Sequence, residues 1–209
     1  MIVSDEARLL FVHVQKTGGV STERHLRAAL EDAQSVKGVY RHATYAEILA
    51  KHPEYADYWS FAFVRNPWSR LWSWWRMIQR QKGSIERGKE EAAERVEKNK
   101  FWADVVESIE TFEQFVLEGP DRHDRLRTPQ VAYLSAPGRE IDFIGRTETF
   151  EDDLTTIFTQ RGLPAFEKVE HVNKGLLRKA DYTDQYDDAM RRKVEEIFGE
   201  DIERFGYTF

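Results

Sequence analysis

The sequence predicts an α/β fold: a three-layer sandwich whose central, mostly parallel sheet of four or five strands is covered by helices on both faces. Two observations support this prediction. Short apolar runs typical of buried strands alternate with segments whose apolar residues recur at helical spacing. The chain has 209 residues, of which 41% are hydrophobic, so it can bury a substantial core. We therefore expect one domain spanning residues 1–209.

Three apolar runs are expected to form strands of this sheet. They are Leu9–Val14, Phe61–Arg65 and Ile141–Gly145. A pair of glycines follows the first run and Asn66-Pro67 follows the second. Such residues end strands because they favour turns or remove the donor that a ladder needs.

Helices are expected between and after the strands. Thr44 and Glu47 have capping-box spacing, Pro67 suits the first position of a helix, and Thr149 is expected to cap another. The remaining helices are Val20–Leu30 and one marked by Tyr186, Met190, Val194 and Ile197. The tryptophans that follow Pro67 recur at helical spacing, and we interpret them mainly as core residues.

A charged excursion interrupts this alternation at about residues 82–104. Eleven of the nineteen residues from Lys82 to Lys100 are charged, and the alanines and glutamates favour helix. We expect a solvated helical excursion from the domain; a lid over the site and a dimer contact are the alternatives.

Composition excludes several classes of protein. The net charge is −6, which disfavours non-specific nucleic-acid binding but allows a local basic pocket for a small anion. No apolar run approaches the roughly 20 residues of a transmembrane helix. The first residues lack the pattern of a signal peptide, and cysteine is absent, so we expect a cytoplasmic protein.

The segment Phe11–Thr22, FVHVQKTGGVST, predicts an anion site. A strand, a turn with two glycines and a helix would aim several backbone N–H groups at one point, at the positive end of the helix dipole. Lys16 adds a positive charge, and Ser21 and Thr22 add hydroxyl donors. The lysine precedes the glycines, so this is not a Walker A loop, and an incidental strand–helix turn is the alternative.

A second anion site is expected where the second strand ends. Arg65 ends that strand and Ser73 lies eight residues later, inside the following helix. A helix that returns beside its strand can bring a guanidinium and a hydroxyl to a common point, where they would bind a phosphate. The alternative is that Arg65 makes an ordinary ion pair.

These segments resemble sulfotransferases that use 3′-phosphoadenosine 5′-phosphosulfate (PAPS). FVHVQKTGG is similar to the family's 5′-phosphosulfate loop, and FAFVRNPWSRLWSWW to its 3′-phosphate segment. The resemblance is closest to the carbohydrate branch and its small bacterial relatives, and it continues through Thr128-Pro-Gln130, IDFIGRTETFEDDL, HVNKG and DIERFGYTF. Gln15 replaces the usual proline and Val20 the usual hydroxyl residue, and no lumenal anchor like that of Golgi members is present.

The resemblance implies a fold like that of P-loop NTPases and transfer of a sulfuryl group from PAPS to a hydroxyl or amine of an acceptor, without a metal. Lys16 would stabilise the leaving phosphate, and Arg65 and Ser73 would select the 3′-phosphate. The residues implied in donor binding are Lys16, Thr17, Gly18, Gly19, Val20, Ser21, Thr22, Arg65, Ser73, Lys174 and Arg178. The last two follow His171, in a loop whose alternative role is an ordinary basic surface.

His42 is the candidate general base, because RHATYAEI resembles the family segment that carries a catalytic histidine. A histidine that packs at the helix start is the alternative, and Glu47 and Asp57 are fallback bases. His13 is expected in the core and His25 on the solvent side of its helix.

Two other functions stay open at this stage. A nucleotide-dependent kinase would need a lysine after the glycines and a magnesium-binding aspartate, and neither is evident. A non-catalytic nucleotide-binding module would not need Lys16, Arg65 and Ser73 together. The acceptor, a small molecule or a carbohydrate, cannot be read from the sequence, although Arg127 and Gln130 are candidates to line its side, and a homo-oligomer is compatible with the sequence.

Overall fold

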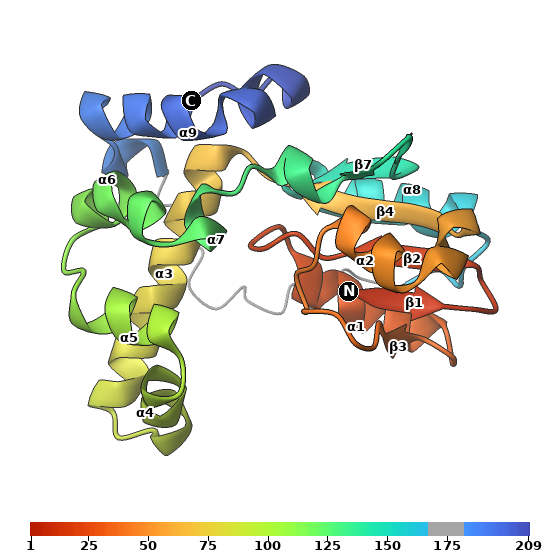
Figure 1. Cartoon of the computed structure of the whole chain (residues 1–209), viewed down its shortest axis with the longest axis horizontal. Helices are drawn as coiled ribbons and strands as arrows, with labels where there is room; N and C mark the ends of the chain where they lie inside the picture. Colours follow the sequence, from red (N-terminus) through yellow and green to blue (C-terminus); the bar gives the residue numbers. More distant parts are fainter. Residues whose placement is uncertain (167–181) are drawn as a thin grey trace. The chain divides into compact units, whose positions relative to one another are not determined.

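The computed structural model describes residues 1–166 and 182–209. The chain forms two compact units, one of Met1–Arg65 and Gln130–Leu177 and the other of Asn66–Pro129 and Arg178–Phe209 (Figure 1). The expectation that residues 1–209 form a single domain stays a prediction.

The first unit is built on a five-stranded sheet in the order β3-β1-β2-β4-β7. Its strands are β1 Ile2–Ser4, β2 Leu9–Val12, β3 Gln34–Ser35, β4 Trp59–Val64 and β7 Phe143–Arg146. β2 pairs in parallel with β4, and β4 with β7, whereas β1 is antiparallel to both of its neighbours. Four of the five strands therefore run in one direction, and the predicted mostly parallel sheet is confirmed.

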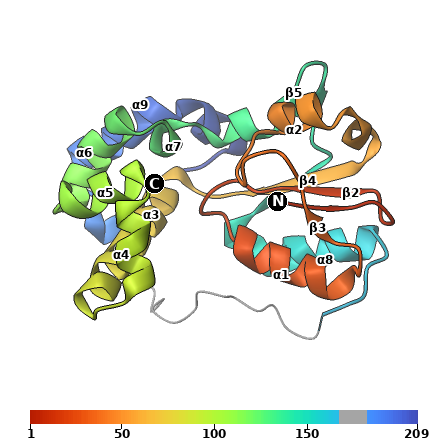
Figure 2. The ribbon, with the colours of Figure 1, turned by 60° about the horizontal axis from the view of Figure 1, so that its bottom comes forward.

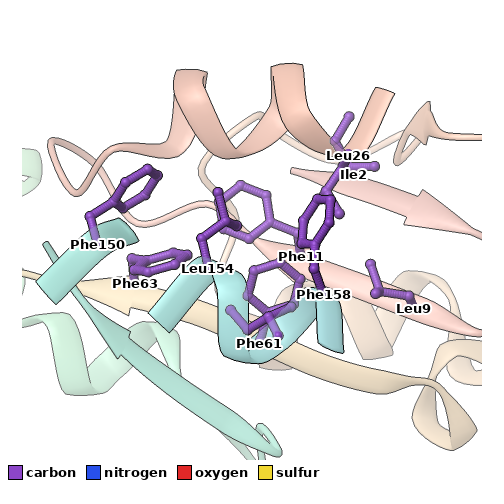
Figure 3. Packing of buried hydrophobic residues seen from close by; sticks show 10 residues of the cluster. Ile2, Leu9, Phe11, Leu26, Phe61, Phe63, Phe150, Leu154 and Phe158 are labelled. Atoms are coloured by element: carbon purple, nitrogen blue, oxygen red, sulfur yellow. The ribbon is translucent and has the colours of Figure 1, made fainter. Parts of the chain in front are cut away.

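Helices cover both faces of this sheet, as predicted (Figure 2). α1 (Gly19–Ala29) and α8 (Phe150–Gln160) lie on one face, and α2 (Tyr45–Lys51) lies on the other. Side chains alternate between the faces of a strand, so Phe61 and Phe63 of β4 point together toward α8. The core on that face joins strands β1, β2 and β4 to helices α1 and α8 (Figure 3); its buried members are Ile2, Leu9, Phe11, Leu26, Phe61, Phe63, Phe150, Leu154, Ile157 and Phe158.

The remaining parts of the first unit are short. They are η1 Pro53–Asp57, η2 Gln130–Tyr133, η3 Thr147–Thr149 and a separate hairpin of β5 Ser135–Ala136 and β6 Arg139–Glu140. The predicted Thr44 capping box is present, with Thr44 accepting from the backbone of Glu47. Thr149 stands at the N-cap of α8, but its hydroxyl donates to Asp153 (2.8 Å) instead of capping the backbone, so that detail of the prediction is wrong.

The described part of the second unit is helical. Its helices are α3 Pro67–Glu86, α4 Glu90–Glu97, α5 Lys100–Glu107, α6 Phe112–Arg122, α7 Asp124–Arg127, η5 Tyr182–Gln185 and α9 Asp188–Phe205. Pro67 is the first residue of α3, as expected. Trp68, Trp74 and Trp75 are buried, which confirms the core interpretation for these three, and Trp72 is half-buried. The charged excursion is helical too, and α4 buries only Ala92 and Val96.

Candidate functional site

The predicted anion loop connects β2 to α1. Gly18 is the N-cap of α1 with a left-handed backbone (φ 85°), and Lys16 also has a positive φ, of 70°. A side chain at a left-handed position costs of the order of 1–2 kcal/mol, and such strain is concentrated at functional sites. The first turn of α1 contains no acidic residue, so the positive end of its dipole is not neutralised there.

Both glycines of the loop are required by their neighbours. A Cβ on Gly18 would lie 2.9 Å from the ring of Phe150, and one on Gly19 would lie 1.9 Å from Nε2 of His13. Real Cβ atoms do not approach other atoms so closely, so the two rings hold the backbone of the loop in place. The loop is thus shaped by packing from β2 and α8.

The hydroxyl groups of the loop hold its shape. Thr17 Oγ1 donates to the carbonyl of Val14 (2.9 Å), and Thr22 Oγ1 to that of Gly18 (3.3 Å); both residues are fully buried. Ser21 is buried as well, whereas Val20 is exposed. The first N–H groups of a helix have no acceptor within it, so these backbone donors are the ones best suited to an anion.

Arg65 follows the last residue of β4, and its side chain lies against the anion loop. Nη1 of Arg65 donates to the carbonyl of Lys16 (3.4 Å). The main chain of Arg65 is held by Gln130, whose amide accepts from Arg65 N (2.9 Å) and donates to Arg65 O (2.8 Å). Because β2 and β4 are parallel, their carboxyl ends place Lys16 and Arg65 at the same edge of the sheet.

His42 precedes α2 and is tied to the strand that leads into the loop. Its Nδ1 lies 2.9 Å from the carbonyl oxygen of His13, and the two rings meet edge to face with centroids 4.5 Å apart. A carbonyl only accepts, so Nδ1 of His42 carries the proton and Nε2 of the neutral ring can receive one. Burial, followed by the neighbouring His13, lowers the pKa of His42 to about 3, so the ring is neutral near pH 7.

A comparison with known protein families identifies the chain. A family model described as "Sulfotransferase family" matches residues 1–208. The chain belongs to the sulfotransferase family. A comparison with curated proteins found no match. The resemblance seen in the sequence is therefore confirmed at the level of the family, and the α/β architecture is the one that it implied.

Several site residues of this sulfotransferase are not brought together within one unit. Ser73 is half-buried on α3 in the second unit, whereas Arg65 belongs to the first. Their joint binding of a phosphate stays a prediction. Lys174 and Arg178, with His171 before them, lie outside the described residues.

Other sequence-based assignments change. Glu47 is an unsuitable base because its carboxylate accepts from both the backbone N and the hydroxyl of Thr44. His25 is buried against Phe158 and Phe166, so the expected exposure was wrong. Gln130 is fully buried on the main chain of Arg65, and this corrects its proposed place on the acceptor side.

The structure also places three further residues named from the sequence: His13, Asp57 and Arg127. His13 is buried, as expected. Asp57, the other fallback base, ends η1, and its carbonyl accepts from Arg8. Arg127 is exposed on α7 in the second unit.

Sequence reasoning missed Glu23, which stands one turn after the anion loop. Its carboxylate contacts Nδ1 of His13 (2.9 Å) and Nη2 of Arg41 (2.7 Å). Burial alone would raise the pKa of Glu23, but hydrogen bonds from His13 and from the amino group of Met1 outweigh it and hold the pKa below its usual range. An acidic residue so close to an anion-binding loop was the available signal.

Two further observations concern metal ions and membranes. Residues 1–166 and 182–209 contain no group of three or more histidine or acidic side chains placed to hold a metal ion. Within the same ranges, no helix combines the length and apolar character needed to cross a membrane.

Proposed function

We propose that this sulfotransferase uses PAPS as donor and transfers its sulfuryl group to a hydroxyl or amine of an acceptor. The observation that carries the proposal is the contact between the guanidinium of Arg65 and the main-chain carbonyl of Lys16, in the loop before α1. Two cationic residues and a helix N-terminus without acidic residues suit a ligand with two anionic groups.

The donor fits the chemistry of these residues. Backbone N–H groups from Gly18 to Val20 bind the phosphosulfate, and Lys16 neutralises the charge that develops on the leaving phosphate. Arg65 binds the 3′-phosphate together with Ser73. The hydroxyls of Ser21 and Thr22 and the loop residue Thr17 support this loop, and Lys174 and Arg178 are further donor-binding residues of the proposal.

His42 is the general base of the proposed reaction. Its Nε2 takes the proton of the acceptor hydroxyl while the acceptor oxygen forms a bond to sulfur. The bond between sulfur and the bridging phosphate oxygen breaks at the same time, and its electron pair leaves on 3′-phosphoadenosine 5′-phosphate, next to Lys16. A general base contributes about 10²–10⁴-fold to the rate when its pKa lies near the operating pH, and the pKa of about 3 in the free protein places His42 at the low end of this range.

Carbohydrates are the first acceptors to test, because the loop motifs resemble those of the carbohydrate branch. The cysteine-free composition supports a cytoplasmic location as part of the same proposal. We also propose that the chain self-associates through the charged helices α4 and α5.

Calorimetric titration with 3′-phosphoadenosine 5′-phosphate tests the donor site, beside AMP and ATP without magnesium. We expect binding that needs the 3′-phosphate and weakens about 10- to 100-fold in Arg65→Ala, the loss of a hydrogen bond to a charged group. Arg139→Ala, an exposed arginine of β6, is the matched control and should bind normally. Equal binding of ATP, or no binding at all, contradicts the proposal and favours the kinase or the binding module.

A further inference from the structure

The carboxylate of Glu23 joins two residues that flank the candidate base. Oε1 lies 2.9 Å from Nδ1 of His13, and Oε2 lies 2.7 Å from Nη2 of Arg41. Glu23 belongs to α1, His13 follows β2, and Arg41 precedes α2, so one side chain links three segments that are distant in sequence. All of these contacts lie within the first unit.

His42 stands between the two arms of this link. It follows Arg41 directly, and its Nδ1 donates to the carbonyl of His13. The edge-to-face contact between the two histidine rings leaves His42 little freedom to rotate while His13 stays in place. Fixing both Arg41 and His13 therefore fixes the position and the tautomer of His42.

The surroundings leave the side chain of Arg41 room to move when its contact with Glu23 is cut. A cavity of about 320 Å³ borders it, lined by Met1, Glu23, Ser35, Val36, Val39 and Arg41. The side chain of Arg41 is 53% exposed, so its contact with Glu23 is not enforced by close packing around it. Tyr40 is also exposed; its carbonyl accepts from the N–H of Ala43 (2.9 Å), and its ring meets that of His42 edge to face with centroids 5.7 Å apart.

We infer that Glu23 is a positioning residue: it holds His13 and Arg41 so that His42 keeps its Nδ1–H tautomer, with Nε2 ready to take a proton. This inference rests on the proposed function, in which His42 is the base. It adds a coupling between the donor-binding helix and the segment that carries the base. A merely structural Glu23 would affect stability and leave the tautomer of His42 unchanged.

Nitrogen NMR of the full chain with ¹⁵N-labelled histidine tests the inference without an acceptor. We expect His42 of the wild type to show the Nδ1–H tautomer, and Glu23→Gln and Arg41→Met to show a mixture of tautomers. Arg41→Lys, which can keep the ion pair, should restore the wild-type spectrum. Glu31→Gln is the matched control, because Glu31 is an exposed residue of the same unit.

Binding and turnover complete the experiment. Both disrupting variants should bind 3′-phosphoadenosine 5′-phosphate with nearly wild-type affinity, while kcat for sulfation of a sugar acceptor falls about tenfold, part of what a general base contributes. Arg41→Met keeps the test decisive if Glu23→Gln fails to fold, since Arg41 is exposed. An unchanged His42 tautomer in folded variants, or a different tautomer in the wild type, overturns the inference. Failure of the wild type to bind the nucleotide instead overturns the proposed function.

Discussion

The guanidinium of Arg65 donates a hydrogen bond to the main-chain carbonyl of Lys16, with 3.4 Å between Nη1 and the oxygen. The bond joins the end of β4 to the loop after β2, at a residue whose backbone is left-handed. The cationic residues Lys16 and Arg65 are thus in contact, and the role of each can be tested separately.

Replacement of Lys16 separates strain from chemistry. Lys16→Ala keeps the backbone strain and Lys16→Gly relieves it, so we expect the glycine variant to be about 1 kcal/mol more stable than the alanine variant by urea unfolding. Both variants lack the ammonium group and should lose about 10²-fold or more in turnover with PAPS. Normal turnover in either variant would remove Lys16 from catalysis.

Gly19 should not tolerate a side chain. In Gly19→Ala the new methyl group would meet the ring of His13, so we expect a loss of roughly 1–3 kcal/mol in the free energy of unfolding, typical of an overpacked core. Gly199→Ala on α9 is the control, because a Cβ there meets nothing within 4 Å and alanine favours helix. Equal stability of Gly19→Ala and the wild type would show that the loop is not held by His13.

His42 should make stability depend on pH. Its pKa is about 3 in the folded protein and near 6.5 when unfolded, so the unfolded state binds more protons between these values. Stability is therefore fully present above about pH 6.5 and falls as the pH decreases, by about 1 kcal/mol per pH unit from this group. Urea unfolding between pH 6 and 4.5 should show a shallower dependence in His42→Gln than in the wild type.

The same variant separates the base from the donor site. His42→Gln should bind 3′-phosphoadenosine 5′-phosphate normally and lose about 10²-fold in turnover. Full activity would assign the base to another residue. An identical pH dependence of stability in the variant and the wild type would show that His42 titrates normally in the folded protein.

Local signals in the sequence predicted the parts of the fold that local physics decides. The capping box of Thr44, the proline at the start of α3 and the strand–glycine–helix pattern around Lys16 each involve residues a few positions apart. The strands β1 and β3 were missed because they are short, and β3 has two exposed polar residues. Their place in the sheet depends on pairing with distant segments rather than on a repeating apolar pattern.

The candidate site shows the same division. Lys16 and Arg65 could be proposed from sequence because Arg65 directly follows a recognisable strand and Lys16 lies in the glycine-containing turn after another. The roles of Glu23, Gln130 and buried His25 could not, because they depend on contacts with side chains or main chain on other elements. A polar residue that satisfies a distant main-chain group leaves no periodic signal in its own neighbourhood.

The amide of Gln130 bonds to the main chain of Arg65 through two hydrogen bonds. The chain leaves the first unit after Arg65 and returns to it at Gln130. The buried side chain of Gln130 thus joins the two points between which the intervening helices are inserted. Insertions, deletions or replacements in those helices would leave the sheet and its anion loop intact as long as Gln130 keeps its hydrogen bonds to Arg65. Descendants of such a gene would acquire new acceptors through changes beyond α3, whose Ser73 belongs to the proposed donor site, and would inherit the donor chemistry unchanged.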